Sequence, residues 1–469
     1  MKINKNGYII LKNDITEKKL KDLKSDLTVS PYIMNEFGTN IEKKFPVYLE
    51  SPNRIYIPRF YGNKNIEQLE YSGSPGEGIQ CEFNGDLRDI QKPIYDLSIN
   101  GIKKVGGGII SLKCGGGKTV LALYILAALK LKTIIVVHKD FLMTQWIERI
   151  EQFIPNAKIG KIQQNIIDID GKDIVLAMAQ SLSMKEYNKK IFESFGFAIF
   201  DECHHFGAEI FHKCMLKVAS KYMLGLSATP NRKDGLRKVF EWFIGPILYV
   251  SKDINTDYIE VDILKYTCND DNYCKIVNNV KGNPCYPIMI NNICYYEPRT
   301  KIIIDKIIEL YNMDRDILFL SDRRDHIVFI HDFLILNGYD CGYYIGGMKS
   351  NELKISQEKN IILGTFSMAS EGMDIPKLNT IILGSPKSDI EQSIGRILRQ
   401  PKHIRKFHPY VFDIWDDFSN FTNQFNKRLK FYNKNNYDIH IIDNGERSKY
   451  IKNLKKVKKA KKASICLID

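Results

Sequence analysis

Residues 112–119, Leu-Lys-Cys-Gly-Gly-Gly-Lys-Thr, have the residue types that bind phosphate groups. Glycines allow the backbone to approach an anion closely, and the unpaired N–H groups at the start of a helix attract negative charge. In such a loop Lys118 would reach the β- and γ-phosphates of a nucleotide, and the Thr119 hydroxyl would hold Mg²⁺. The pattern G-x-x-x-x-G-K-[ST] begins with glycine, where this chain has Leu112. The segment alone is therefore also compatible with a glycine-rich turn that carries an incidental lysine.

Two adjacent carboxylates, Asp201 and Glu202, directly follow the apolar run 197–200. Nucleotide hydrolysis needs one carboxylate for the Mg²⁺ shell and a second to orient and deprotonate the attacking water. Both must lie at the carboxyl end of a strand beside the phosphate loop. An adjacent acidic pair is usually a surface feature, but a pair that follows an apolar strand and a phosphate loop predicts a nucleotide-hydrolysing site.

These residues must be positioned by strands and helices that alternate along the chain. Buried strands are predicted for the short β-branched or apolar runs at residues 109–112, 133–137, 174–177, 198–200 and 223–226. Helices are predicted at 119–131, 141–153 and 206–219. The alternation resumes with strands at 317–320, 361–364 and 380–383 and helices at 300–311, 327–336 and 390–398. Such alternation favours parallel, doubly wound sheets.

The predicted fold class is therefore α/β, with two parallel-sheet domains in tandem. Residues 1–80, with one helix-like stretch at 15–27 and Pro-interrupted segments, are predicted to be a small N-terminal accessory domain. Residues 81–254 form the first α/β domain, and 299–446 the second. Residues 255–298 are predicted to be an irregular connector, because their apolar residues follow neither the helical nor the strand period. Residues 447–469 form a basic C-terminal tail.

The 469 residues include 68 Lys and Arg against 55 Asp and Glu, a net charge of +13, which suggests a polyanionic partner such as nucleic acid. Nine basic residues and no acidic one lie between Arg447 and Lys462, so the rest of the chain carries 13 − 9 = +4. The tail could be a basic helix on a polyphosphate backbone, a nuclear localisation signal or a solvated terminus. We expect its deletion to weaken nucleic-acid binding.

Targeting and metal-binding patterns are weak. No apolar signal segment follows Met1 and no apolar run reaches 18 residues, so we expect a soluble intracellular protein without a membrane partner. The ten cysteines contain no CxxC pair, which argues against a zinc ribbon or a redox dithiol. Cys203, His204 and His205 are more easily explained by the nucleotide site than by a metal centre.

The Asp-Glu-Cys-His sequence at 201–204, placed after this phosphate loop, resembles the superfamily 2 helicases over roughly residues 85–435. Further motifs carry the same resemblance. They are Leu-Arg-Asp-Ile-Gln at 87–91, His-Lys-Asp-Phe-Leu-Met-Thr-Gln-Trp at 138–146, Ala-Gln-Ser-Leu at 179–182, Leu-Ser-Ala-Thr-Pro at 226–230, Gly-Thr at 364–365, Glu-Gly-Met-Asp-Ile-Pro at 371–376, and Gln-Ser-Ile-Gly-Arg-Ile-Leu-Arg at 392–399. The resemblance implies two RecA-like domains and an ATP hydrolase that uses ATP and Mg²⁺.

The resemblance also implies a role for each matching residue. The catalytic residues are Lys118, Asp201, Glu202, Gln392, Arg396 and Arg399, and the two arginines, three positions apart on one helix face, can reach the γ-phosphate. The nucleotide-binding residues are Arg88, Gln91, Cys114, Gly115, Gly116, Gly117, Lys118, Thr119, Gly372 and Asp374. Mg²⁺ is held through Thr119 and Asp201. Coupling residues are His204, which we expect to hydrogen bond to the Ser227 region, with Ser227 and Thr229. Nucleic-acid contacts are His138, Lys139, Gln145, Gln180, Ser181 and Thr365.

The motifs around residues 227–235 and 243–246 are similar to the xeroderma pigmentosum group B branch and to large-DNA-virus helicases of the poxvirus transcript-release type. This similarity implies a monomeric motor that tracks DNA in the 3′ to 5′ direction, largely independently of sequence, and displaces a strand or transcript. Transcription machinery would be a partner, and the virion, host cytoplasm or nucleus the location. An RNA helicase, a non-hydrolysing clamp on a motor fold and the motor subunit of a nuclease remain alternatives.

Overall fold

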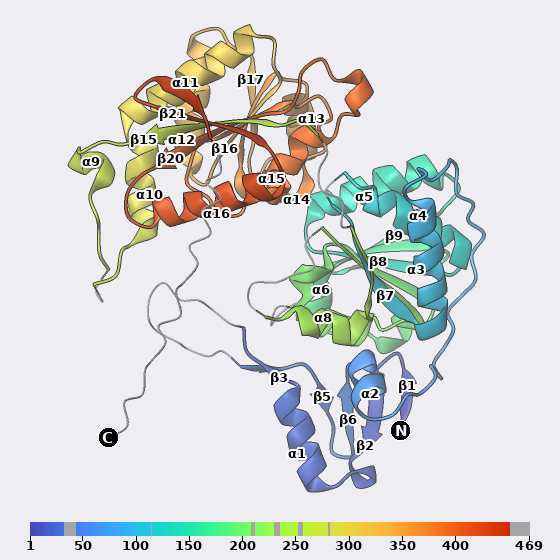
Figure 1. Ribbon diagram of the computed structural model, residues 1–469. Coiled ribbons are helices and arrows are strands. Elements are labelled where there is room, and N and C mark those ends of the chain that lie inside the picture. Colours follow the sequence, from blue (N-terminus) through green and yellow to red (C-terminus); the bar gives the residue numbers. More distant parts are fainter. Residues whose placement is uncertain are drawn as a thin grey trace, which may run out of the picture.

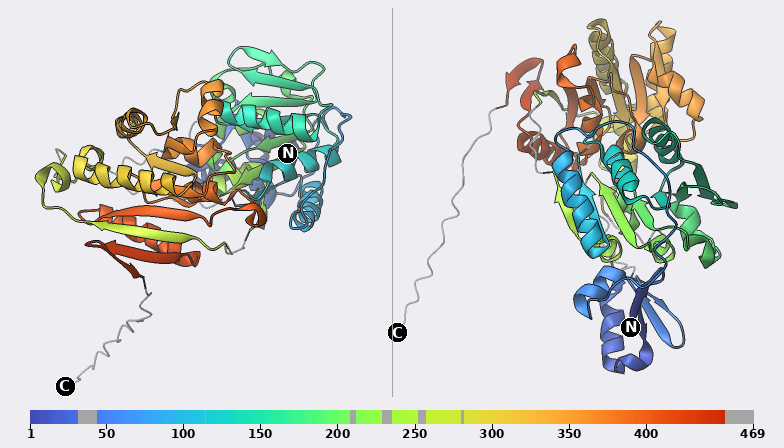
Figure 2. Two further views of the ribbon diagram at one scale, coloured as in Figure 1. Left: turned by 90° about the horizontal axis from the view of Figure 1, so that it is seen from above. Right: turned by 90° about the vertical axis from the view of Figure 1, so that its right-hand side faces the viewer.

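The computed structural model describes residues 1–31, 44–113, 115–207, 212–228, 235–251, 257–279 and 282–450. Figure 1 shows an N-terminal unit and two larger bodies, each built around a sheet. The right panel of Figure 2 places the N-terminal unit against the first body, at the end away from the second. Among the described residues, none of the helices combines the length and the apolar character that a membrane crossing requires.

The N-terminal unit is a small antiparallel sheet with two helices. Its strands run in the order β1 (Lys2–Asn4), β2 (Gly7–Leu11), β6 (Arg54–Ile57) and β5 (Leu49–Glu50), and β3 (Thr28–Val29) pairs separately with β4 (Phe45–Pro46). Helices α1 (Glu17–Asp26) and α2 (Arg59–Asn65) flank the sheet. Tyr8 and Ile57 join the same apolar core as Val239 of the first large body, so the unit is packed onto that body.

The first large sheet has the strand order β10-β9-β11-β8-β12-β13-β7-β14. Its strands are β7 (Gly107–Ser111), β8 (Thr133–Val137), β9 (Ile159–Gln163), β10 (Ile166–Asp168), β11 (Ile174–Met178), β12 (Phe197–Phe200), β13 (Tyr222–Ser227) and β14 (Ile247–Val250). All neighbours are parallel except β10 and β9. The residues of the central strands β8, β11 and β12 are all buried, and all but Thr133 are apolar, because helices cover both faces of the sheet.

Alternate side chains of the strands enter two separate cores. One core contains apolar residues of α3 (Lys92–Val105), α4 (Lys118–Leu129) and α5 (Asp140–Phe153). The other contains residues of α6 (Ala179–Met184), α7 (His212–Lys217) and α8 (Arg237–Ile244). The helix predicted at 206–219 is shorter in the structure, where a 3₁₀ turn (Cys203–Gly207) precedes α7 and residues 208–211 lie outside the described part.

The second large sheet has the order β17-β18-β16-β19-β20-β15-β21-β22. Its strands are β15 (Glu260–Tyr266), β16 (Ile317–Ser321), β17 (Cys341–Tyr344), β18 (Ile361–Thr365), β19 (Thr380–Leu383), β20 (Tyr410–Asp416), β21 (Asp438–Asp443) and β22 (Glu446–Lys449). Only β21 and β22 are antiparallel neighbours. The helices are α11 (Glu297–Asn312), α12 (Arg324–Leu336), α13 (Ser350–Gln357), α14 (Phe366–Gly372), α15 (Glu391–Ile394) and α16 (Phe421–Lys434). The two parallel-dominated sheets confirm the predicted α/β class.

The segment predicted to be an irregular connector, residues 255–298, is ordered in large part. It contains β15, which lies between β20 and β21 in parallel register, and the helices α9 (Asp271–Cys274) and α10 (Tyr286–Tyr295). The strand has no continuous apolar pattern because Asp262 is buried in it, where its carboxylate accepts a hydrogen bond from the Tyr410 hydroxyl at 2.9 Å. Buried acids weaken the sequence signal of a strand, and the partner that makes this one acceptable lies far along the chain.

Two further boundaries differ from the expected ones. Arg447, predicted to open the basic tail, lies in β22 at the edge of the second sheet and forms ion pairs with Glu260 and Asp262. Residues 451–469 of the tail lie outside the described residues. The helix predicted at 390–398 is the short α15 followed by a 3₁₀ turn (Gly395–Leu398).

Candidate nucleotide site

The phosphate loop lies between the end of β7 and the start of α4, as the sequence predicts. Gly115 and Gly117 adopt φ angles of 78° and 75°. These left-handed conformations are unfavourable for residues with a Cβ, so the glycines set the shape of the loop. The loop leads directly into α4, whose first residues are Lys118 and Thr119. The positive end of the helix dipole therefore lies beside the loop, in the region where a phosphate would lie. Cys114 lies outside the described residues.

Gln91 and Arg88, predicted to bind the nucleotide, contact the phosphate loop. The Gln91 amide nitrogen donates to the carbonyl oxygens of Gly116 and Gly117 at 3.3 and 3.1 Å, and its amide oxygen accepts from the Arg88 backbone N–H at 3.2 Å. The Arg88 guanidinium donates to the Gly115 carbonyl at 3.4 Å. A Cβ on Gly117 would lie 2.5 Å from the Gln91 amide nitrogen. Gln91 therefore packs against the loop and helps to fix its conformation.

Lys118 and Glu202 form an ion pair, with 2.6 Å between the ammonium and one carboxylate oxygen. The second carboxylate oxygen of Glu202 accepts from the Ala228 backbone N–H at 3.4 Å and lies 3.4 Å from His204 Nδ1. Burial opposes ionisation of Glu202, but the charges of Lys118 and His204 outweigh burial and lower the pKa of Glu202 below its ordinary value. Glu202 is therefore a carboxylate, the form that a general base requires.

His204 provides the expected link to the end of β13. Its Nδ1 shares a hydrogen bond with the Ser227 hydroxyl, with 2.9 Å between the two atoms. Because His204 also contacts Glu202, its side chain connects the acid pair to the end of the neighbouring strand β13. Thr229, the third predicted coupling residue, lies outside the described residues.

Asp201 is buried at the end of β12 and is held by two hydrogen bonds. One oxygen accepts from the Trp146 indole N–H at 2.9 Å, and the other accepts from the Glu202 backbone N–H at 3.0 Å. Burial, and secondly the charge of Glu202, raises the pKa of Asp201. The sequence assigned Trp146, the last residue of the motif at 138–146, no role in the site. It is buried, but a buried indole N–H needs an acceptor, and that requirement is the signal that could have placed it beside an acid.

The second domain brings an arginine and a carboxylate to the same region. Arg399 forms an ion pair with Asp374, whose other oxygen accepts from the Arg149 guanidinium of α5 at 2.8 Å. Burial opposes ionisation of Asp374, but Arg399 and then Arg149 lower its pKa below the ordinary value. Because Arg149 belongs to the first domain, Asp374 joins the two domains. The sequence did not predict Arg149.

A cavity of about 350 Å³ lies between the two domains. Its walls include Thr119 and Asp201 from the first domain and Asp374 and Arg399 from the second. Gln145, predicted to contact nucleic acid, also lines this cavity. The structure thus brings together residues that are as much as 280 positions apart in the sequence (399 − 119 = 280).

The remaining predicted site residues lie close to this region. Arg396 is buried and donates to the Met373 carbonyl at 2.8 Å. Gly372 is the last residue of α14, and Gln392 lies in α15, half-buried. These residues belong to the second domain, like Arg399.

The predicted nucleic-acid contacts other than Gln145 follow the carboxyl ends of parallel strands. His138 and Lys139 follow β8, and the centre of the His138 ring lies 4.2 Å from the centre of the His205 ring. Gln180 and Ser181 follow β11, and the Ser181 hydroxyl accepts from the Gln164 backbone N–H at 2.9 Å. Thr365 ends β18, and its hydroxyl accepts from the Met368 backbone N–H at 3.4 Å. Each sheet therefore presents these groups at the edge that carries the nucleotide-site residues.

The comparisons with known proteins match both domains. The family described as type III restriction enzyme, res subunit, matches residues 84–232, and the family described as helicase conserved C-terminal domain matches residues 300–400. The chain is 39% identical over 464 residues to a protein of Acanthamoeba polyphaga mimivirus that is named as a predicted ATP-dependent RNA helicase; the match covers 96% of this chain and 88% of that one. The chain belongs to the superfamily 2 helicases found in large DNA viruses.

This helicase has more distant relatives as well. It is 26% identical over 404 residues to a predicted helicase of Invertebrate iridescent virus 6, covering 81% of this chain and 88% of the relative. Its fold resembles that of a Saccharomyces cerevisiae Dbp5 variant solved with RNA and ADP BeF3, with a TM-score of 0.51, 13% identity, and coverage of 71% of this chain and 85% of that one. The helicase therefore has the tandem RecA-like fold, and it is an ATP-dependent nucleic-acid helicase and ATP hydrolase.

Proposed function

We propose that the helicase moves along DNA in the 3′ to 5′ direction, driven by ATP hydrolysis in the cavity between its two domains, and displaces a paired strand or a transcript. The observation that carries ATP-driven movement is the composition of that cavity, which is lined by Thr119 and Asp201 of the first domain and by Asp374 and Arg399 of the second. A nucleotide held from both sides would draw the domains together, and loss of its γ-phosphate would let them separate.

On the first domain, Lys118 would exchange its Glu202 partner for the β- and γ-phosphates of ATP. Glu202 would then be available to orient and deprotonate the attacking water. Arg88, Gln91, the loop residues from Cys114 to Gly117, and Gly372 would complete nucleotide binding. The close packing of Gln91 on the loop supports a role for this residue in shaping the phosphate site.

Mg²⁺ would be held through Thr119 and Asp201. Asp201 is buried and accepts two N–H bonds, and within the described part of the chain no lysine or arginine forms an ion pair with it. A buried carboxylate whose pKa is raised by burial is suited to a cation that supplies the missing charge. When bound, Mg²⁺ would neutralise charge on the phosphate oxygens.

On the second domain, Arg399 and Arg396 would contact the γ-phosphate, with Gln392 beside the attacking water. Arg399 now pairs with Asp374 and Arg396 with the Met373 carbonyl, so both would have to change partners as the domains close. Charged arginines aimed at the developing phosphate charge supply about 10³- to 10⁵-fold in rate in related phosphoryl-transfer enzymes. Asp374, released by Arg399, would be free to accept a hydrogen bond from the ribose.

Coupling to the track would run through the contact between His204 and Ser227, with Thr229 following Ser227 in the chain. The track itself would lie over His138, Lys139, Gln180, Ser181 and Thr365, at the carboxyl edges of the two sheets. Contacts with the phosphate backbone would make binding largely independent of sequence. We further propose that the helicase works as a monomeric motor with the transcription machinery, in the virion and host cytoplasm or in the nucleus.

RNA is the second candidate track, favoured by the name of the mimivirus relative. The deciding experiment compares ATP hydrolysis stimulated by single- and double-stranded DNA and RNA of one sequence, and then strand displacement on duplexes with 3′ or 5′ tails. Stronger stimulation by DNA with displacement only from a 3′ tail is the expected result. Stronger stimulation by RNA would show that RNA, and not DNA, is the preferred track. Absence of stimulated hydrolysis with every nucleic acid would overturn the proposed movement along a nucleic-acid track.

A further inference from the structure

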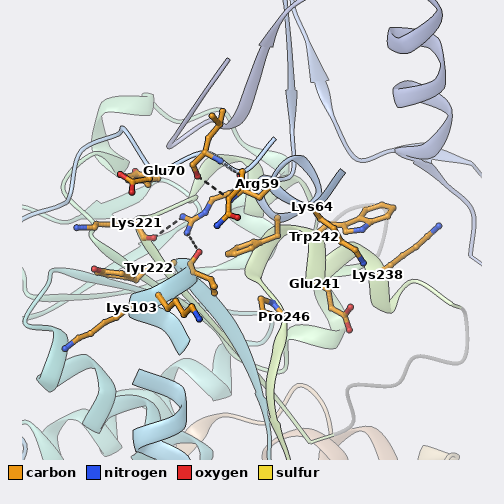
Figure 3. Close-up of a pocket in the computed structure, with 18 residues that line it drawn as sticks. Arg59, Lys64, Glu70, Lys103, Lys221, Tyr222, Lys238, Glu241, Trp242 and Pro246 are labelled. Carbon is orange, nitrogen blue, oxygen red and sulfur yellow. Dashed lines mark hydrogen bonds between the residues drawn. The ribbon is translucent and has the colours of Figure 1, made fainter. Parts of the chain in front are cut away.

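A groove of about 980 Å³ lies between the N-terminal unit and the first RecA-like domain (Figure 3). One wall is α2 and the segment after it, and the other is formed by the end of α3, the start of β13 and α8. Gly107 and Tyr222 are the first residues of β7 and β13, and the phosphate loop follows the other end of β7. The groove and the ATP cavity therefore lie at opposite edges of the same sheet.

The groove is strongly basic. Its walls carry five lysines and an arginine against two acids, Glu70 and Glu241. The lysines are Lys64, Lys103, Lys104, Lys221 and Lys238. Within the described part of the chain, no ion pair joins any of these five to a carboxylate, and Glu241 is already paired with Arg237. Like charges gathered around one hollow repel one another, so a bound anion would relieve a repulsion that the protein leaves uncompensated.

Arg59 joins the two walls and adds a fixed positive charge. Its guanidinium is buried and donates to the backbone carbonyls of Ser220, Lys221 and Val105 at 3.3, 2.9 and 3.1 Å. Burial lowers the pKa of Arg59 to about 10, so the group stays charged at neutral pH. Gly106 has a φ of 88°, and a Cβ there would lie 1.5 Å from the guanidinium. The Arg59 contacts thus hold the two walls of the groove together, and Lys64, Lys103 and Lys238 on these walls are exposed.

We propose that this groove binds the phosphate backbone of nucleic acid, as a second contact separate from the one at the carboxyl edges of the sheets. Its exposed lysines lie on three different elements, with Lys64 on α2, Lys103 on α3 and Lys238 on α8. Charges distributed in this way suit a ligand that repeats its charge along its length, whereas a single phosphate would need them to converge. Lysines on flexible stems contact a backbone without reading bases.

The proposal rests on the nucleic-acid track of the proposed function. A strand held over the carboxyl edges is present at high effective concentration near the rest of the protein, so even a weak second site contributes to overall affinity. Because Tyr8 and Val239 share one core, a strand in this groove would be held by a surface that moves with the first domain. The second domain could then step relative to it.

The test neutralises three groove lysines in the full-length protein, as Lys64→Gln, Lys103→Gln and Lys238→Gln together. The control neutralises three exposed lysines of α1 that do not line the groove, as Lys18→Gln, Lys19→Gln and Lys21→Gln. Fluorescence anisotropy measures the affinity for a single strand of about 40 nucleotides and for a duplex of about 40 base pairs. Both are longer than the roughly 16 nucleotides that one single-strand-binding domain covers. Salt is varied from about 0.05 to 0.3 M.

In the groove variant, the slope of log affinity against log salt should become shallower by about 0.7 to 0.9 for each phosphate contact removed, or by roughly 2 to 3 for the three lysines. Affinity near 0.1 M salt should fall at least about tenfold, while the control keeps the slope of the natural protein. At saturating nucleic acid the maximal ATP hydrolysis rate should not change, and more nucleic acid should be needed for half-maximal stimulation. Replacing the same three lysines by arginine should restore the slope, and all variants should melt like the natural protein.

A groove variant whose slope and affinity equal those of the control would overturn the proposal. That result is distinguishable from failure of the proposed function, in which the natural protein itself would show neither nucleic-acid binding nor stimulated hydrolysis. Loss of binding in the glutamine variant without recovery in the arginine variant would also count against a backbone contact, since both residue types carry the required charge.

Discussion

Replacing Glu202 by glutamine tests the central acid of the nucleotide site and should change ATP hydrolysis and ATP binding in opposite directions. The natural carboxylate lies 2.6 Å from the Lys118 ammonium, and their side chains are only 15% and 13% exposed. Glutamine keeps the size of the side chain and one oxygen acceptor, but it removes the negative charge and the basic oxygen. Any change in activity therefore reports charge and basicity more than shape.

The magnitudes follow from the two roles of Glu202. General-base catalysis contributes about 10²- to 10⁴-fold, so the hydrolysis rate should fall by that factor, equivalent to about 3 to 5 kcal/mol of barrier. ATP binding requires Lys118 to leave Glu202. The variant replaces this ion pair by a bond between the ammonium and a neutral amide oxygen, so it should release Lys118 more easily by roughly 1 kcal/mol. ATP should then bind about fivefold more tightly.

Single-turnover hydrolysis and equilibrium binding of a fluorescent ATP analogue measure these two effects separately. Glu186→Gln is a suitable control, because this carboxylate is 92% exposed and pairs only at the surface with Lys217 at 3.2 Å. The control should leave both quantities unchanged. Hydrolysis by Glu202→Gln at the natural rate would refute the role of Glu202 as the base. Weaker ATP binding would refute the competition between the carboxylate and the phosphates for Lys118.

Three further predictions concern other parts of the helicase. Arg149→Gln removes the contact with Asp374 across the domain boundary. Because both side chains are more than a third exposed, this ion pair contributes less than about 1 kcal/mol. Without ATP, single-molecule FRET between the domains should therefore show a population of open molecules that is up to about fivefold larger. Gln91→Ala removes two hydrogen bonds to the phosphate loop and should raise the KM for ATP about tenfold at unchanged expression, whereas an unchanged KM would show that the loop holds its shape alone. Burial, and secondly Arg299, lowers the pKa of His326 to about 3, so the unfolded chain takes up a proton below pH 6.5 while the native state does not. The free energy of unfolding should therefore decrease as the pH is lowered below about 6.5. Between pH 7 and pH 5, urea unfolding should show a decrease about 2 kcal/mol larger in the natural protein than in His326→Gln. Equal pH dependence in the two proteins would contradict this assignment.

The sequence predicted those elements whose signal is local. The strand Thr133–Val137 was predicted with its observed bounds, because a run of β-branched residues buried on both faces has few other structures available. The strand Glu260–Tyr266 was missed, because Asp262 interrupts its apolar pattern. Asp262 is tolerated there only because Tyr410 and Arg447 bind its carboxylate, and no local pattern can announce partners so far away.

The same distinction applies to the candidate site. Lys118, Asp201 and Glu202 were predictable because the chemistry of nucleotide hydrolysis dictates both the residue types and their place at strand ends. Trp146 and Arg149 were not predicted as site residues. The first acts by holding Asp201 from a neighbouring helix, and the second acts by reaching across to the other domain. Contacts of this kind depend on how helices pack, which spacing along one chain does not encode.

The position of β15 has a consequence for how the second domain is made. In the sheet it lies between β20 and β21, and Glu260 pairs with Tyr410, 410 − 260 = 150 residues later in the chain. During synthesis β15 therefore emerges long before either neighbour, and the sheet around it cannot close until residues 410–443 have left the ribosome. Contacts this distant in sequence slow folding. A recombinant fragment limited to residues 300–400, the stretch that matches the helicase C-terminal family, would lack β15 and both of its neighbours, and we expect it to aggregate instead of folding as a separate domain.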